Sequence, residues 1–257
     1  MDALVLAGGG VNPADPIYQI NNKLPKSLTP IAGKPMVQWV LDALSGAASI
    51  NQIFVIGLDE SSGLTSTKPL TYLSEAGSIF ENIINGAAYS IKANPEDSHL
   101  LTVSSDLPTL TSPIIDFCIQ MYGDLSLDIY YAVIERETME KRFPGSKRTY
   151  IKVKDAEICG GDANCIRKEA ALNPDGIWTE IIRQRKNPLK QASIIGWGTL
   201  FGLLLGTLTL DEAVQRVCKR LGISGKAIIM PYAEIGMDVD KPFQHKIVEE
   251  DLLRVTN

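Results

Sequence analysis

The sequence contains little histidine and little cysteine, and this scarcity narrows the kinds of site that it can build. Among 257 residues there are two histidines, at positions 99 and 245, and four cysteines, at 118, 159, 165 and 218. No pair of cysteines has the C-x-x-C spacing of zinc sites and redox motifs. Neither a structural zinc centre nor a disulfide framework is expected, and the cysteines are expected to be reduced and mostly buried.

Basic residues are also few. Lys and Arg number 25 against 30 Asp and Glu, the formal net charge is −5, and no basic run stands out. A nucleic-acid partner is therefore not expected, because such a partner requires a basic surface. The first apolar run begins at Leu4, which leaves no room for a signal peptide, so a cytoplasmic location is expected.

The strongest motif is LVLAGGG at residues 4–10. Residues 4–6 predict a short buried parallel strand, and the three glycines after Ala7 let the backbone bend and come close to a ligand. Lys23 and Lys26 follow and supply positive charge. Backbone N–H groups together with an ammonium suit a polyphosphate. The turn has neither the P-loop ending nor the dinucleotide spacing Gly-x-Gly-x-x-Gly.

The rest of the chain alternates between strand and helix patterns, which predicts a parallel sheet with right-handed crossovers. Its length and its 45% hydrophobic content favour a single domain over 1–257, with a helical insertion around 163–222. Strands are expected at 4–6, 53–58, 100–103, 127–135, a stretch ending at 159–160, and 226–230. Helices are expected at 35–48, 79–87, 113–122, 177–185 and 211–221, and from residue 242.

Carboxylates follow two of the predicted strands. Asp106 comes directly after the strand at 100–103, and the carboxyl ends of parallel strands form the ligand crevice of such sheets. Asp238 and Asp240 are two residues apart, so in extended chain they point the same way. A shared Mg²⁺ is the favoured interpretation, since this ion binds one or two carboxylates plus phosphate oxygens. The alternative is that these residues form turns or cap helices.

Four segments together resemble one family, the nucleotidyltransferases with a GT-A-like fold. This family includes molybdenum-cofactor guanylyl- and cytidylyltransferases, methylerythritol-phosphate cytidylyltransferase and sugar-1-phosphate nucleotidylyltransferases. The matching segments are LVLAGGG at 4–10, PKSLTPIAGKPM at 25–36, SSDLP at 104–108 and DVDKP at 238–242. The resemblance implies an α/β, Rossmann-like three-layer sandwich with a mostly parallel central sheet. It also implies a Mg²⁺-dependent transfer of NMP from an NTP to a small phosphorylated acceptor, with release of pyrophosphate.

The resemblance also implies roles for individual residues. The catalytic pair would be Lys26 and Asp106, and the metal ligands Asp106 and Asp240, with Asp238 as a further candidate. The nucleotide would be bound by Leu6, Ala7, Gly8, Gly9, Gly10, Lys23, Lys26, Gly77, Ser78, Asn82 and Ser105, and the acceptor by Arg148, Gly160, Gly161 and Asp162. Ser78 has a second interpretation as a simple helix cap.

The sequence departs from the family at one point, because no basic residue lies between Gly10 and Lys23 where the family carries an Arg. This departure keeps a non-catalytic nucleotide-binding regulatory protein as one alternative. A GT-A glycosyltransferase that uses a nucleotide sugar is the other, although such enzymes show an acidic pair where this chain has Ser104-Ser105-Asp106.

One uncharged stretch, residues 192–210, is long enough to reach across a bilayer. Its glycines at 198, 202 and 206 have the spacing of close helix contacts. Its threonines favour a buried helix or a contact between subunits of a homo-oligomer. Membrane contact through this stretch is the less favoured interpretation.

Overall fold

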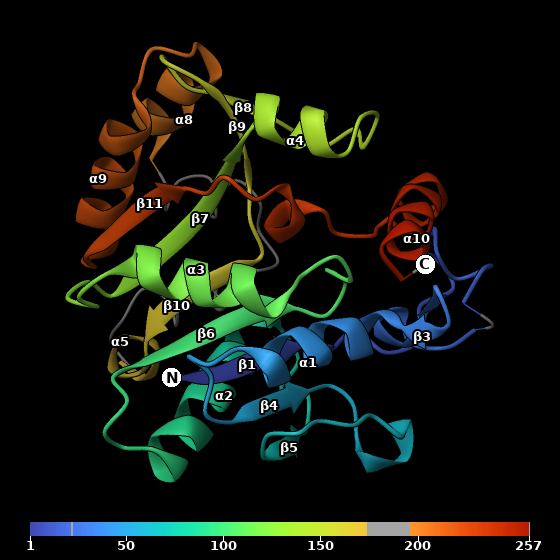
Figure 1. Ribbon diagram of the computed structural model, residues 1–257. Coiled ribbons are helices and arrows are strands. Elements are labelled where there is room, and N and C mark those ends of the chain that lie inside the picture. Colours follow the sequence, from blue (N-terminus) through green and yellow to red (C-terminus); the bar gives the residue numbers. More distant parts are fainter. Residues whose placement is uncertain (22, 174–195, 257) are drawn as a thin grey trace.

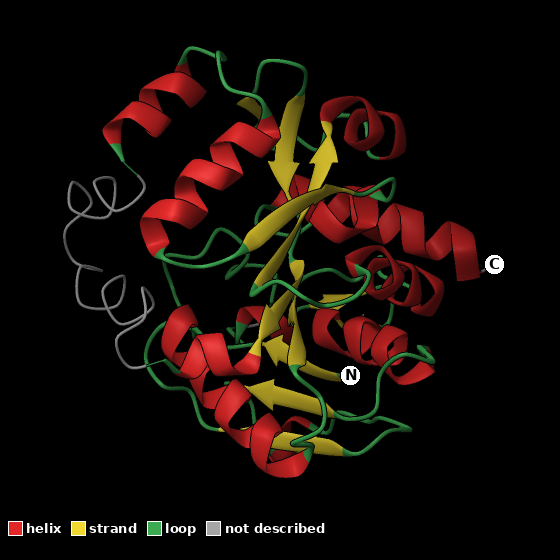
Figure 2. Cartoon of the chain, turned by 90° about the vertical axis from the view of Figure 1, so that its left-hand side faces the viewer, coloured by secondary structure: helices red, strands yellow, loops and turns green. Residues whose placement is uncertain are grey.

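The computed structural model describes residues 1–21, 23–173 and 196–256. In this part of the chain a nine-stranded sheet lies between layers of helices, as the edge-on view in Figure 2 shows. A two-stranded hairpin, β2 (Pro30–Ile31) with β3 (Lys34–Pro35), stands apart from this sheet. The expected α/β fold is therefore confirmed.

Half of the sheet is parallel. Strand β1 (Asp2–Leu6) lies between β4 (Ile53–Ile56) and β6 (His99–Ser104), and β5 (Leu70–Leu73) adds to the far edge of β4; all of these pairs are parallel. The chain reaches each of them through a helix or a loop, as the succession of patterns predicts. The carboxyl ends of β1 and β6 consequently lie next to each other, at Leu6 and Ser104.

The other half of the sheet is mixed. Strand β10 (Ala163–Arg167) is antiparallel to both of its neighbours, β6 and β7 (Ile129–Glu135). Strand β9 (Glu157–Gly160) pairs antiparallel with the end of β7 and with β8 (Ile151–Lys152), and β11 (Gly225–Ile229) runs parallel to β7. The sheet is thus mixed rather than mostly parallel.

Helices cover both faces of the sheet. Helices α1 (Met36–Gly46) and α3 (Ser112–Tyr122) lie in front of the sheet in Figure 1 and bury their apolar sides against β1, β4 and β6. Helices α2 (Ile79–Ala93) and α5 (Lys168–Leu172) cover the opposite face of these strands, and α8 (Trp197–Leu204) and α9 (Leu210–Leu221) lie over β8 and β11. Helix α4 (Arg136–Arg142) follows β7, and α10 (Pro242–Thr256) ends the chain.

Local signals explain where α9 begins and ends. Thr209 accepts a hydrogen bond from the backbone N–H of Glu212, and the Glu212 carboxylate accepts one from the backbone of Thr209, which forms a capping box. Gly222 ends the helix in the left-handed conformation, with φ of 66°. The predicted helix at 211–221 is confirmed.

The region around 163–222 begins with a strand rather than a helix. Residues 163–167 form β10, which pairs antiparallel with β6 on one side and with β7 on the other, so the predicted helical insertion is wrong at its start. The helix expected at 177–185 lies outside the described residues. Strand β5 and helix α4 were not predicted. Arg142 in α4 forms ion pairs with Asp251 and Glu234.

The uncharged stretch at 192–210 is not one long helix in its described part. Helix α8 ends at Leu204, and Gly206 turns the chain with φ of 62°. Burial is mixed, because Leu208 is buried whereas Phe201 and Leu205 are 58% and 72% exposed. Among the described residues, a Cβ atom on Gly202 would meet Leu208 and one on Gly198 would meet nothing within 4 Å, so here the glycine spacing does not mark a contact between two helices of the chain. Among the described residues, no helix is long and apolar enough to cross a membrane.

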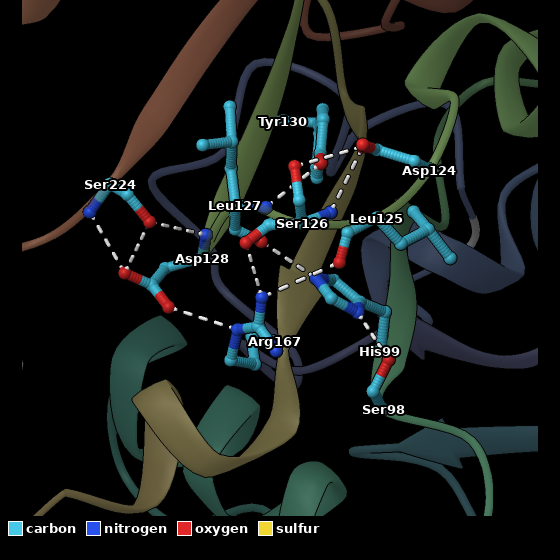
Figure 3. A network of polar contacts seen from close by, with 10 residues as sticks. All are labelled: Ser98, His99, Asp124, Leu125, Ser126, Leu127, Asp128, Tyr130, Arg167 and Ser224. Atoms are coloured by element: carbon cyan, nitrogen blue, oxygen red, sulfur yellow. Dashed lines mark hydrogen bonds and ion pairs between the residues drawn. The ribbon is translucent and has the colours of Figure 1, made fainter.

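A polar network ties together the strand ends far from Leu6 and Ser104 (Figure 3). The Asp128 carboxylate accepts hydrogen bonds from Nε of Arg167 and from the backbone and hydroxyl of Ser224. Burial opposes the charge of Asp128, but the bonds from Ser224 and Arg167 outweigh it and lower its pKa. His99 contacts the carbonyl oxygen of Leu127 through Nε2. Strands β6, β7, β10 and β11 are thereby joined at one end.

Candidate functional site

A polar pocket of about 440 Å³ opens where β1 and β6 end. The predicted binding residues that line it come from the end of β1 with the glycine turn, from the start of α2, and from Asp162. The lining consists of Leu6, Gly8, Gly9, Glu75, Gly77, Ser78, Ile79, Asn82, Ile83, Thr102, Ser104, Asp162 and Asn164. The pocket thus joins the glycine turn, the start of α2 and the two strands that flank the sheet's change from parallel to antiparallel pairing.

The glycine turn lies close to other backbone. Gly9 and Gly10 have φ of 102° and 53°, which glycine adopts without strain. A side chain on Gly57, at the end of β4, would collide with the Cα of Gly8. A Cβ on Gly8 would lie 2.8 Å from Oε1 of Glu75. The turn is therefore packed on one side and open toward the pocket on the other.

Glu75 is one of the pocket residues that were not predicted from the sequence; the others are Ile79, Ile83, Thr102, Ser104 and Asn164. Oε1 of Glu75 accepts a hydrogen bond of 3.0 Å from the backbone N–H of Gly9, a group expected to meet phosphate. A bound triphosphate would have to displace this carboxylate, because both are negative and both need the same donor. No sequence signal distinguishes Glu75 from other acidic residues in a loop.

Ser78 and Asn82 line the pocket, but each has a structural bond. The Ser78 hydroxyl accepts from the backbone N–H of Glu81 at 3.2 Å and so caps α2, whereas its predicted contact with the nucleotide stays a prediction. The amide oxygen of Asn82 accepts from the backbone N–H of Ala76 at 2.7 Å. These bonds fix the loop that presents Gly77 to the pocket.

Next to the pocket, the ammonium of Lys26 lies between two carboxylates. Its Nζ is 2.5 Å from Oδ2 of Asp106 and also bonds Oδ1 of Asp240. Burial of the ammonium disfavours its charge, but Asp106 and Asp240 outweigh this effect and raise the pKa of Lys26. Ser104, which lines the pocket, donates to the other oxygen of Asp106 at 2.6 Å. Residues from three distant segments thus meet at one point, as predicted.

Asp238 and Asp240 bind different cations. Asp238 forms an ion pair with Arg148, whereas Asp240 bonds Lys26. The backbone N–H of Asp240 donates to Gln244 in α10. In this arrangement Asp238 holds Arg148 beside β9, where the Cys159 thiol contacts the guanidinium. The binding of one metal ion by these carboxylates stays a prediction.

Asp162 adds a further carboxylate to this cluster. It follows the Gly160-Gly161 turn that joins β9 to β10, and its side chain faces the pocket. Burial raises the pKa of Asp162 to about 6, helped by Asp106 and Asp240 and opposed by Arg148 and Lys26. Asp162 was predicted to contact the acceptor, and its position lies between the polar pocket and Arg148.

Eight of the residues predicted to bind the nucleotide or the acceptor do not line the polar pocket, namely Ala7, Gly10, Lys23, Lys26, Ser105, Arg148, Gly160 and Gly161. Lys23 is exposed, with φ of 64°, and its backbone N–H bonds the side chain of Asn21. Gly10 is exposed beyond the glycine turn, and Ser105 is buried with its backbone N–H bonded to Leu6. Of the two lysines predicted to bind phosphate, only Lys26 reaches the carboxylates.

The cluster has the donors that Mg²⁺ prefers. Four carboxylates, from Asp106, Asp162, Asp238 and Asp240, face two cations, Lys26 and Arg148, which leaves two surplus negative charges when all are ionised. Within the described residues, no group of three or more His, Cys, Asp and Glu side chains is placed to hold a metal ion. Mg²⁺ is usually held by one or two carboxylates with substrate phosphates and water, so Asp106 and Asp240 fit such an ion.

Comparisons with known proteins identify relatives in sequence and in fold. The sequence profile of the MobA-like NTP transferase domain matches residues 3–188. A hypothetical transferase from Thermus thermophilus shares 30% sequence identity, with a TM-score of 0.79 over 95% of this chain and 98% of that chain. The comparison with curated proteins found no match.

Two further solved structures share the fold at low identity. CMP:2-keto-3-deoxy-manno-octonic acid synthetase, complexed with CTP, matches with a TM-score of 0.60 at 14% identity, covering 99% of each chain. The 4-diphosphocytidyl-2C-methyl-D-erythritol synthase from Anaerococcus prevotii matches with a TM-score of 0.56 at 10% identity, covering 98% of this chain and 95% of that chain. At this identity the likeness concerns the fold alone.

Proposed function

Because the chain belongs to the MobA-like NTP transferase family, we propose that it is a Mg²⁺-dependent nucleotidyltransferase. It moves a nucleoside monophosphate from an NTP to a small phosphorylated acceptor and releases pyrophosphate. The observation that carries the proposal is the Lys26 ammonium held between Asp106 and Asp240 beside a polar pocket that begins at the glycine turn.

In this proposal the nucleotide lies in the polar pocket, with its phosphates against the backbone N–H groups of Gly8 and Gly9. Glu75 then releases Gly9, and Lys26 turns from the carboxylates toward the phosphates. Gly77, Ser78 and Asn82 shape the far wall of the pocket, where the base would fit. Because the family's Arg after the glycines is missing, Lys26 supplies the positive charge that neutralises the phosphates.

Asp106 and Asp240 are the residues that would hold Mg²⁺, which supplies charge neutralisation on the phosphates. Release of Lys26 from these carboxylates frees both of them for the ion. The reaction needs no general base on the protein, because the acceptor phosphate is already an anion. Its oxygen forms a bond to the α-phosphorus, and the bond from that phosphorus to the bridging oxygen breaks as pyrophosphate leaves.

Arg148, Gly160, Gly161 and Asp162 would face the acceptor. Nε of Arg148 is buried and has no hydrogen-bond partner within the described residues. An unsatisfied buried donor on a cation is costly, and an acceptor phosphate would satisfy it.

The test has two steps. The melting temperature of the purified protein is first measured with each of ATP, GTP, CTP and UTP plus Mg²⁺, and one NTP should raise it most. Pyrophosphate is then measured with that NTP and a set of small phosphate monoesters. Release that depends on both acceptor and Mg²⁺ supports the proposal. Formation of NDP from a nucleotide sugar would indicate a glycosyltransferase, and NTP binding without turnover would indicate a regulatory protein.

A further inference from the structure

A second pocket lies on the same side of the sheet as the polar one, and it is almost entirely apolar. Its volume is about 310 Å³, and it lies between strands β7 and β11 and helices α8 and α9. Alternate residues of β7 form its floor, namely Ile129, Tyr131 and Val133, and Ala213, Val214 and Val217 of α9 form its roof. Lys226 is the one charged residue among the described residues that line it.

The apolar pocket is open to solvent. Tyr131 and Ile151 line it and are 44% and 50% exposed, although Val133, Val153 and Ile158 beside them are buried. Apolar surface in contact with water favours any ligand that covers it, at roughly 25 cal/mol per Å². Volumes of 300 Å³ and more are typical of small-molecule sites.

The polypeptide between Cys159 and Asp162 separates the two pockets. Cys159 and Gly160 line the apolar pocket, and Asp162 lines the polar one. Tyr131 covers Gly160 so closely that a side chain there would collide with the phenol oxygen. Glycine at this position therefore keeps the ring of Tyr131 at the boundary.

The charged groups of the proposed acceptor site lie at this same boundary. Arg148 contacts the thiol of Cys159. Burial raises the pKa of the Tyr131 phenol, the nearby charge of Asp162 raises it further, and the nearby charge of Arg148 lowers it. A molecule with a phosphate at Arg148 would therefore have the apolar pocket directly beside it.

We propose that the acceptor of the transfer reaction is a phosphate monoester of an apolar group, and that this group occupies the pocket between β7 and α9. The inference rests on the proposed function, because it assigns the acceptor's phosphate to Arg148 and the attack on the α-phosphorus to that phosphate. The apolar group takes no part in the bond changes and serves to position the phosphate. A cavity of about 150 Å³ holds benzene, so this pocket has room for roughly ten carbon atoms.

The inference can be tested without any nucleotide. Binding of ethyl, butyl, hexyl and octyl phosphate to the full-length protein is measured by calorimetry. Burial of each methylene should tighten binding about fourfold, so octyl phosphate should bind far more tightly than ethyl phosphate. Affinity that does not change with chain length would overturn the inference, and so would equal affinity for octanol and octyl phosphate.

Two variants in α9 locate the binding site. Val217→Trp fills the pocket and should weaken octyl phosphate at least tenfold while ethyl phosphate binds as before. Gln215→Trp, on the exposed side of the same helix, should bind like the unchanged protein. If Val217→Trp does not fold, Val214→Phe replaces it. Unchanged octyl phosphate binding in a folded pocket variant would place the ligand elsewhere and overturn the inference.

Transfer assays separate this inference from the proposed function. With NTP and Mg²⁺, pyrophosphate release should be faster with hexyl or octyl phosphate than with ethyl phosphate. Length-dependent binding without any turnover would reject the nucleotidyltransferase, whereas turnover that favours short acceptors would reject the apolar acceptor and leave the enzyme.

Discussion

Nζ of Lys26 lies 2.5 Å from Oδ2 of Asp106, although the two residues are 80 positions apart in the sequence. In this state the lysine neutralises a carboxylate, and in the proposed reaction it must neutralise phosphate instead. The same ammonium also bonds Asp240, so one side chain links the beginning, the middle and the end of the chain.

Replacing Lys26 should remove most of the activity. Lys26→Ala takes away a positive charge where negative charge builds up on the phosphates, and kcat/KM should fall at least about a hundredfold, a loss of roughly 3 kcal/mol. Lys23→Ala is the matched control and should have nearly normal activity, since Lys23 is exposed and lies outside the pocket. Pyrophosphate release measures both. Normal kinetics in Lys26→Ala would remove this residue from the site.

Replacing Asp106 or Asp240 should change the Mg²⁺ dependence of the rate, whereas replacing Asp238 should not. Asp106→Asn and Asp240→Asn should each abolish the Mg²⁺-dependent rate, because each removes one of two carboxylates that face the same point. Asp238→Asn should keep its Mg²⁺ requirement and raise the KM of the acceptor, because Asp238 holds Arg148. Rates are measured against Mg²⁺ concentration. A lost Mg²⁺ response in Asp238→Asn, with a normal one in Asp240→Asn, would exchange their roles.

The stability of the metal-free protein should depend on pH through Asp162. The pKa of this carboxyl is raised to about 6 from 3.8, so the folded protein binds its proton more tightly than the unfolded chain does. The contribution of Asp162 to stability is therefore fully present below about pH 4 and is lost as pH rises through 6. At pH 7, Asp162→Asn should be more stable than the unchanged protein by on the order of 2 kcal/mol.

Urea unfolding at pH 4 and pH 7, in the presence of a chelator, measures this difference. Asp155→Asn is the control, because it removes a carboxyl that is exposed. A stabilisation by Asp162→Asn that is the same at both pH values would mean that the proton on Asp162 is not the cause.

A side chain on Gly57 should disturb the glycine turn. Gly57 has φ of 97°, and its Cβ would collide with the backbone of Gly8. Gly57→Ala should lower the free energy of unfolding by more than about 2 kcal/mol and weaken NTP binding. Gly63→Ala has a similar positive φ but meets open space, so it should cost only about 1 kcal/mol and leave NTP binding normal. Equal losses in both variants, by denaturant titration, would show that backbone strain alone matters.

The sequence by itself determined the motifs that meet at the site. The apolar run before the glycines forms β1, and the Pro-Lys segment contains Lys26. Asp106 follows β6, and Asp240 precedes α10, as the patterns around each residue predict. These features depend on short-range rules, namely alternation, turn glycines and proline at a helix start, which act within a few residues.

The tertiary structure alone decided which of these residues act together. Asp238 and Asp240 have equivalent positions in the sequence pattern, yet they bind different cations, because the fold brings Arg148 to the first and Lys26 to the second. Glu75 reaches Gly9 across 66 positions, and β10 inserts antiparallel between β6 and β7, for which no local signal exists. Contacts between distant segments depend on the packing of the whole sheet, and a single sequence does not encode them in any local pattern.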